Sequence, residues 1–530
     1  MLLLATALAV CTSALTVGID LGTTNSAIAV LRQGRPVVVP NRRGELTTPS
    51  VVAFTDSGVL VGAEALEQSR SNVANTVVAA KRFIGRTFRA CRADARSAGF
   101  DVRKAAEGGG VVFNLPAEPT PILPQEVSAA LLLQLLADAE RATGAAPTAA
   151  VITVPAHFDD AQREATRTAA ALAGLAEVTL LEEPVAAALA YGLSGKPGTA
   201  LVLDLGAGTF DVSVLQLTPA EAADELMRVE VVATAGDAHL GGHDLDVALT
   251  SHLCDEAEAR GLAPRANPVA VRRLAEVAED AKKRLSVVKR VEIELRGEAE
   301  GEAERERGAA EGCTYSLSRE TLEVLGDPLL RRMREPLYQL ALSARIALPG
   351  ELEPPRPARK PKAKVRAKEA ALRPAGKQKH LPKGTPVDEV LLVGGGTHMV
   401  AVRKLVGTLL GVDPRRTVDP MQAVALGAAV HAGVLSGELR GGRVLAAWQA
   451  KLGAMMGGQM GGRRGATPGA DARDPEREGD AGTAGGDRDD GGSGGDDEES
   501  DDEEEAVAEF YRQLRAEEQA DLASRSGSQL

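Results

Sequence analysis

The most informative stretch of this sequence reads Gly18-Ile19-Asp20-Leu21-Gly22-Thr23-Thr24-Asn25-Ser26. The apolar residues at 17–21 predict a buried strand that carries an acidic side chain at its end. The small and hydroxylated residues that follow predict a loop. A second strand is expected at 27–31, so the segment is a strand, a short Gly/Thr loop and a strand.

The same arrangement occurs again further along the chain. Asp204-Leu205-Gly206 ends another apolar strand, Ala207-Gly208-Thr209 follows as the loop, and the next strand is expected at 212–215. A second pair of segments is also repeated, because Glu183-Pro184 and Asp419-Pro420 each open a helix of small residues. We therefore predict a duplicated α/β domain whose two halves face each other across a cleft.

Glycine and threonine at the end of a strand suit the binding of a polyphosphate. Glycine lets backbone N–H groups approach an anion without a Cβ in the way, and threonine hydroxyls add donors. An aspartate cannot bind phosphate directly, but Asp20 and Asp204 can hold a hydrated Mg²⁺ that bridges phosphate oxygens. One such loop alone is more typical of a hairpin turn. Two loops, together with Gly394–Gly396 after a third strand, predict a nucleotide held from both sides.

These segments resemble the motifs of the 70-kDa heat-shock protein (DnaK-type) family. The matching segments are the first phosphate motif at 18–26, the second at 204–213, the connecting helix at 183–192, the adenosine motif at 393–397, and the stretches 81–85 and 151–163. The resemblance implies an actin-like ATPase domain at 15–435, with lobe I at 15–198 and lobe II at 199–435. It also implies ATP or ADP and Mg²⁺ as the bound cofactors.

The resemblance further implies roles for individual residues. The catalytic group would be Lys81, Glu183, Asp204 and Thr209, with Lys81 on the γ-phosphate and Glu183 orienting the attacking water. Asp20 and Asp204 would hold the water shell of Mg²⁺. The nucleotide-binding residues would be Gly22, Thr23, Thr24, Asn25, Gly208, Thr209, Glu279, Lys282, Lys283, Ser286, Gly395, Gly396, Thr397 and His398. Without the neighbouring motifs, Lys81 would be read as a surface charge and Lys282–Lys283 as a solvated helix face.

Four positions depart from the family pattern around the nucleotide. Ala207 replaces a glycine of the second phosphate loop, and Met421 replaces an acidic residue. His398 and Lys283 stand where the family has arginines at the adenine. A guanidinium stacks on a flat ring in a way that a lysine ammonium cannot, so we expect weaker selectivity for adenine.

The net charge of −13 argues against a general nucleic-acid-binding surface, and the 2% aromatic content argues against base stacking. Residues 471–505 hold 17 Asp/Glu and 3 Arg, whereas 356–383 hold 11 Lys/Arg and one Glu. We predict a disordered basic insert at 349–386 and a disordered Gly-rich and acidic tail at 436–505. The two could attract one another, each could attract an outside partner of opposite charge, with the partner of the acidic tail unknown, or they could act as independent solvated segments. The four cysteines form no CxxC pair, so no zinc site is expected.

The ends of the chain suggest targeting and partner binding. The apolar residues 2–11 predict a signal peptide at 1–14, with a mis-assigned start or a strand extension as the alternatives. A last helix and end are expected at 506–530. No apolar run is long enough for a membrane span. Residues 436–530 show no run of alternating strands, so we expect no peptide-binding domain there.

We therefore expect an ATP-hydrolysing heat-shock-type chaperone or co-chaperone, slow and independent of peptide. The resemblance implies a nucleotide-exchange factor and a J-domain co-chaperone as partners. We expect the lumen of the endoplasmic reticulum, or the cytoplasm or a plastid if the leader is not a signal peptide. The alternatives are a nucleotide-binding adaptor with little hydrolysis and, with no supporting motif, a sugar kinase on the same fold.

Overall fold

The structure is a computed structural model that describes residues 15–69, 71–106, 108–192, 197–218, 228–295, 313–350 and 384–439. The expected signal peptide, most of the basic insert, most of the acidic tail and the last helix lie outside these residues, and they stay predictions. Within the described ranges, no helix combines the length and apolar character that crossing a bilayer requires.

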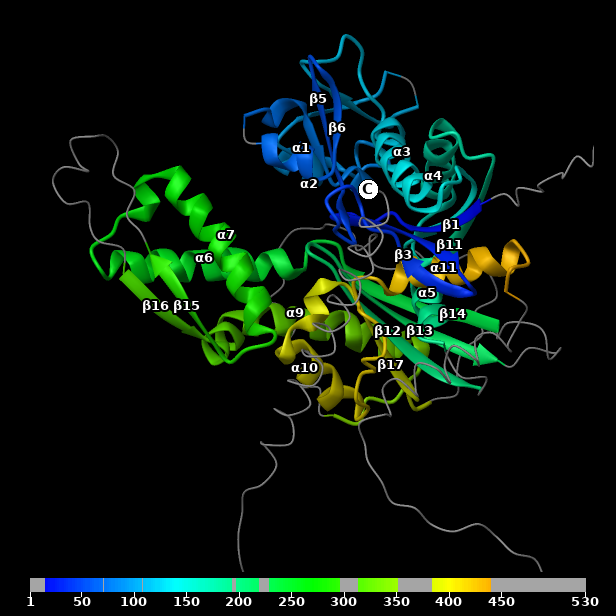
Figure 1. Cartoon of the computed structure of the whole chain (residues 1–530). Helices are drawn as coiled ribbons and strands as arrows, with labels where there is room; N and C mark the ends of the chain where they lie inside the picture. Colours follow the sequence, from blue (N-terminus) through cyan, green and yellow to red (C-terminus); the bar gives the residue numbers. More distant parts are fainter. Residues whose placement is uncertain are drawn as a thin grey trace, which may run out of the picture.

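The first lobe is built on a mixed sheet whose central strand ends at Asp20 (Figure 1). Its order is β11-β10-β1-β2-β3, with β4 beside β2. The strands are β1 (Leu15–Asp20), β2 (Asn25–Arg32), β3 (Arg35–Val38), β4 (Thr48–Pro49), β10 (Pro147–Val154) and β11 (Glu177–Glu182). β1 runs parallel to β10 and antiparallel to β2. Its apolar residues Val17 and Ile19 are fully buried, as the sequence pattern predicts.

Smaller elements and four helices complete this lobe. Two further sheets pair antiparallel strands: β6 (Gly58–Val61), β5 (Val51–Thr55) and β7 (Thr76–Val78) form one, and β8 (Asp101–Lys104) and β9 (Val111–Asn114) form the other. The helices are α1 (Ala63–Gln68), α2 (Arg92–Ser97), α3 (Pro124–Thr143) and α4 (Asp160–Leu172). The side chain of Asp159 caps α4 by accepting a 2.9 Å hydrogen bond from the backbone N–H of Gln162. The cap satisfies one of the N–H groups that have no partner within the first turn of the helix.

The second lobe repeats the pattern of the first. Its main sheet has the order β14-β13-β12-β17, from β12 (Gly198–Leu205), β13 (Phe210–Thr218), β14 (Arg228–Asp237) and β17 (Glu389–Val393). β12 carries Asp204 near its end, runs antiparallel to β13 and parallel to β17. β1 therefore has a counterpart in β12, and the duplication predicted from the sequence is confirmed.

The remaining elements of the second lobe surround this sheet. The helices are α6 (Gly242–Glu258), α7 (Pro268–Leu285), α9 (Arg319–Ala344) and α10 (Val400–Leu410), and the hairpin is β15 (Arg290–Leu295) with β16 (Cys313–Ser318). One large apolar core joins β12 and β13 to α6, α7, α9 and α10. The cores of the two lobes are separate, because residues of β1, β10, α3 and α4 form another cluster.

Two helices join the lobes by crossing between their sheets (Figure 1). α5 (Glu183–Ala190) follows β11 of the first lobe but packs its alanines against β12 and β17 of the second. α11 (Ala423–Leu435) follows the second lobe but packs on β1, β2 and β10 of the first. The helices touch at Gly427, where an added Cβ would lie 1.7 Å from the carbonyl oxygen of Ala186. Only glycine allows the two backbones to approach this closely.

Candidate functional site

The two strand-ending aspartates meet at the bottom of the cleft between the lobes. Asp20 comes from β1 and Asp204 from β12, and both line a cleft of about 1940 Å³. The hydroxyl of Thr153 on β10 donates a 3.5 Å hydrogen bond to Asp20. Equivalent strands of two similar sheets thus present equivalent carboxylates, as the repeat predicts.

Lys81 and Glu183 form an ion pair beside these aspartates. The Lys81 Nζ lies 2.5 Å from Glu183 Oε1, and their side chains are only 9% and 15% exposed. Glu183 is the first residue of α5, and Lys81 lies in a short 3₁₀ turn, η2 (Ala80–Arg82). The turn follows Ala79, whose φ of 52° is unusual for a residue with a side chain. The Lys81 ammonium also lies 5.8 Å from the ring centre of Phe158.

The carboxylates in this group outnumber the neighbouring cations. Burial, followed by the charge of Glu183, raises the pKa of Asp20 to about 7. Burial and Glu183 also hold the pKa of Asp204 well above its usual value, although Lys81 opposes the shift. Burial raises the pKa of Asp211 to about 6. Such a group stays partly protonated until a cation neutralises it.

We expect Asp20→Asn to stabilise the nucleotide-free protein at pH 8 but not at pH 4. The folded-state pKa of Asp20 is about 7, against an ordinary value of 3.8. Between these values the folded protein holds a proton that the unfolded chain has lost, so stability falls as the pH rises to about 7 and is then constant. The neutral amide avoids that loss. Because Asp20 is only half-buried, we expect a gain of about 1–3 kcal/mol at pH 8.

The measurement is urea unfolding of both proteins at several pH values without nucleotide. Asp56→Asn, at an exposed position, is the matched control and should leave the pH profile unchanged. Identical profiles for Asp20→Asn and the parent protein would contradict the charge assignment.

Two serines form hydrogen bonds with the backbone of the first Gly/Thr loop. The backbone N–H of Gly22 donates to Ser26 Oγ at 3.1 Å, and Ser50 Oγ donates to the carbonyl of Gly22 at 2.8 Å. A Cβ at Gly22 would lie 2.0 Å from the carbonyl oxygen of Asn25, so the tight turn requires glycine. Gly22, Thr23, Thr24 and Asn25 all line the cleft.

The second loop is reached by an arginine from the opposite lobe. Arg82 donates from Nη2 to the carbonyl of Gly208 at 3.0 Å, and its Nη1 lies 3.2 Å from Nδ1 of His239. Thr209 lines the cleft, whereas Gly208 does not. The role of Gly208 in phosphate binding stays a prediction, and in this structure its carbonyl accepts the hydrogen bond from Arg82.

On the side where the base is expected, cations are already paired within the protein. Lys282 lies 2.7 Å from Asp246, and Lys283 lies 2.9 Å from Glu279. Burial raises the pKa of Glu279, but Lys283 outweighs it and leaves the pKa below its ordinary value. Glu279, Lys282, Lys283 and Ser286 line the cleft, as do Gly395, Gly396 and His398.

Thr397 of the expected adenosine motif and His398, which follows it, both make contacts within the protein. Thr397 is only 1% exposed, and its hydroxyl donates to the carbonyl of Gly394 at 2.7 Å. It stabilises the turn η4 (Gly395–His398) and does not line the cleft. His398 Nε2 lies 3.5 Å from Asp419 Oδ1. Burial raises the pKa of Asp419, but His398 and the N–H of Met421 outweigh this and hold the pKa below its ordinary value.

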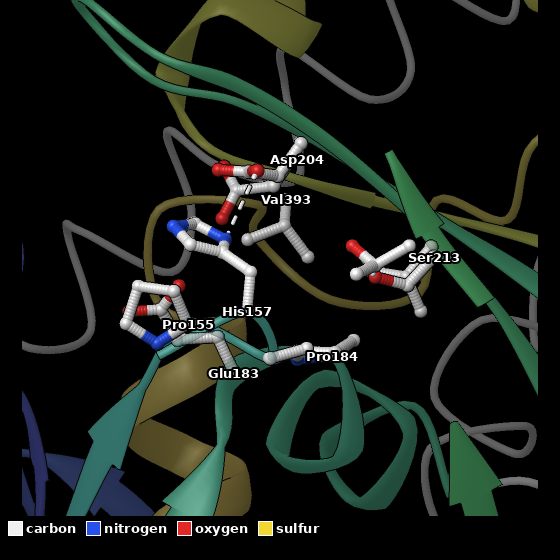
Figure 2. A pocket seen from close by; sticks show the side chains of 11 residues that line it. Pro155, His157, Glu183, Pro184, Asp204, Ser213 and Val393 are labelled. Atoms are coloured by element: carbon white, nitrogen blue, oxygen red, sulfur yellow. Dashed lines mark hydrogen bonds and ion pairs between the residues drawn. The ribbon is translucent and has the colours of Figure 1, made fainter. Parts of the chain in front are cut away.

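Two residues at the carboxylate group were not predicted from the sequence. Asp211 lies opposite Asp204 in the ladder between β12 and β13, and its presence in the second phosphate motif could have indicated it. His157 follows β10, and its Nδ1 lies 3.7 Å from Asp211 Oδ1. Figure 2 shows this ion pair as a dashed line, with His157, Glu183 and Asp204 around one small pocket. His157 lies within the matching stretch 151–163, but no sequence pattern indicated its contact with Asp211, because this partner belongs to the other lobe.

The residues present suit a hydrated Mg²⁺. Oxygen ligands with an excess of negative charge are what this ion prefers, and it commonly retains several waters. Within the described part of the chain, no three acidic, histidine or cysteine side chains are arranged to bind a metal ion directly. Asp20 and Asp204, which line the cleft together with both phosphate-type loops, are the residues that would hold the ion through water.

Two similar lobes joined by crossing helices, with acidic strand ends facing each other in the cleft, define an actin-like nucleotide-binding domain. Comparison with known proteins narrows this class. The family described as Hsp70 protein matches residues 16–348 and 365–446, and the chain belongs to this family.

Curated relatives agree with that assignment. A chaperone protein DnaK of Thermus thermophilus is 42% identical over 426 residues, which are 80% of this chain and 61% of the relative. The chaperone protein dnaK of Cyanidioschyzon merolae is 39% identical over 430 residues, which are 80% of this chain and 62% of the relative. The chain thus spans about three-fifths of the length of the relatives that it matches.

Proposed function

We propose that this chain binds ATP with Mg²⁺ and hydrolyses it, acting as a chaperone or co-chaperone that assists folding or quality control through partners. The observation that carries the proposal is the partly buried carboxylate group around the Lys81–Glu183 pair, in the cleft that both phosphate-type loops line. Membership of the Hsp70 family supports the same activity.

The proposed roles follow from the position of each group. The first loop and Thr209 would hold the phosphates, and Mg²⁺ would neutralise the triphosphate charge beside Asp20 and Asp204. Lys81 would stabilise charge that develops on the transferred phosphoryl group. Glu183, held by Lys81, would orient the attacking water. These roles require that the two lobes be closed, because Lys81 and Glu183 belong to one lobe and Asp204 and Thr209 to the other.

We expect Glu183→Gln to lower the rate of ATP hydrolysis about 10²-fold while ATP affinity changes little, because general acid–base groups contribute that much or more. The measurement is single-turnover hydrolysis by the purified chain, with direct titration of ATP binding. Exposed Glu64→Gln is the matched control and should hydrolyse ATP at the parent rate.

A nucleotide-binding adaptor with little hydrolysis is the second candidate. The pairing of His398 with Asp419 and of Lys282 with Asp246 engages cations expected at the base and ribose, so it bears on ATP affinity, and the hydrolysis rate decides between the two candidates. A parent rate no higher than that of Glu183→Gln, with ATP still bound, would establish the adaptor and reject the enzyme.

The finer features are also proposals. Hydrolysis would be slow and unaffected by unfolded peptide, and turnover measured with and without an unfolded peptide would test this. A nucleotide-exchange factor and a J-domain co-chaperone would be the partners. The compartment would be the lumen of the endoplasmic reticulum, which rests on the apolar residues 2–11. The cytoplasm or a plastid is the alternative.

A further inference from the structure

Two side chains of the first lobe reach across the cleft beside the carboxylate group. Arg82 bonds to the carbonyl of Gly208, and His157 forms an ion pair with Asp211. The two differ in what they hold, because Arg82 contacts a loop carbonyl whereas His157 contacts a carboxylate inside the group. Because His157 belongs to the first lobe and Asp211 to the second, opening of the cleft would separate the two side chains.

His157 lies in the short turn between β10 and α4, next to Phe158, whose ring contacts Lys81. Its ring meets the ring of Phe158 edge-on, with centroids 5.9 Å apart. Phe158 in turn lies beneath the ammonium of Lys81. The same turn thus supports the lysine of the first lobe and contacts the carboxylate of the second.

His157 also lines a small pocket beside the carboxylate group. The pocket has a volume of about 10 Å³ and is lined by Pro155, His157, Glu183, Asp204 and Asp211 among others (Figure 2). That volume holds no more than about one water molecule. The imidazole is 43% exposed and the Asp211 side chain 32% exposed, so the other side of the pair faces the cleft.

We propose that His157 is a positioning residue for ATP hydrolysis. Through its ion pair with Asp211, it fixes this carboxylate of the second lobe relative to Lys81 and Glu183 of the first lobe when the cleft is closed. The inference rests on the proposed function for its hydrolytic part. The pair also holds the lobes together, so it slows the release of nucleotide whether or not hydrolysis occurs.

The test is to compare His157→Ala with the parent chain in two measurements. Single-turnover hydrolysis should fall about tenfold with KM for ATP nearly unchanged, since small misplacements of reacting groups are costly. Release of a fluorescent ADP analogue with Mg²⁺, measured by stopped flow, should become about threefold faster. Asp211→Asn should have a similar effect on release. The double variant should release no faster than the single variants, because one interaction is lost in each case.

Conservative variants separate positioning from a general loss of structure. His157→Lys keeps a cation of sufficient reach and should return both rates most of the way to the parent values, whereas His157→Phe keeps a ring without a charge and should behave like alanine. His252→Ala is the matched control: it removes a 2.8 Å contact with Tyr315 inside the second lobe, and both rates should stay at the parent values.

Two results overturn the inference. One is a release rate in His157→Ala equal to that of the parent chain. The other is a double variant whose effects on release multiply, because the two residues then act separately. If the parent chain releases nucleotide as expected but shows no hydrolysis, the proposed function fails, and the release measurements alone decide whether His157 and Asp211 hold the lobes together.

Discussion

Lys81→Ala is expected to reduce ATP hydrolysis by about 10³-fold while ATP still binds. The ammonium acts on charge that develops in the transition state, and losing one such preorganised donor costs about 10²–10³-fold in known enzymes. In this site the loss is compounded, because Glu183 loses its 2.5 Å partner. Lys81 also lowers the pKa of Asp20, Asp204 and Asp211, so removing it favours their protonated forms.

Binding should survive because the loop around Gly22 supplies backbone and hydroxyl donors that do not depend on Lys81. Single-turnover hydrolysis and a binding titration of the same preparation measure the two effects. Lys104→Ala, an exposed lysine of the same lobe, is the control. Equal turnover in Lys81→Ala and Lys104→Ala would remove Lys81 from the catalytic group.

Gly427→Ala is expected to destabilise the protein strongly, although it adds only one methyl group. The added methyl would lie 1.7 Å from the carbonyl oxygen of Ala186 and 2.4 Å from the carbonyl carbon. Both atoms are backbone, so no flexible side chain can move aside, and α5 and α11 must separate. Overpacking typically costs about 1–3 kcal/mol and occasionally more. We expect about 3 kcal/mol or more, which corresponds to a fall in Tm of about 6–12 °C.

Thermal unfolding of the two proteins without nucleotide measures this effect. Gly110→Ala is a suitable control, because no atom lies within 4 Å of its added Cβ and its φ is not positive. A Tm for Gly427→Ala within about 2 °C of the parent value would show that the helices tolerate a wider separation.

Local patterns in the sequence predicted the parts of the site that one segment builds alone. Asp20 and Asp204 each end a buried strand, and the residues that follow form a turn, so their placement follows from neighbours in the chain. The duplication then predicted that two such loops face one another.

Features that depend on two distant segments were not accessible from the sequence. The hydroxyl of Thr397 turns back to Gly394 because the turn buries it, and a motif of glycines does not specify that direction. His157 and Asp211 meet only because the two lobes close on one another. The exchange of α5 and α11 between the sheets is likewise a property of packing, which sets small residues of one lobe against strands of the other.

The position of α11 has a consequence for how the chain folds as it is made. β1 is among the first described residues to be synthesised, yet the face on which α11 packs is covered only when residues 423–435 emerge. Gly18 shows how closely the two segments pack, because an added Cβ there would lie 2.1 Å from the backbone nitrogen of Ala429, which is synthesised much later. Until then the first lobe exposes Ala27, Ala29 and Val38. Long-range contacts of this kind form slowly and leave apolar surface open to aggregation. During translation, the first lobe of this member of a chaperone family therefore cannot complete its packing until α11 has been synthesised.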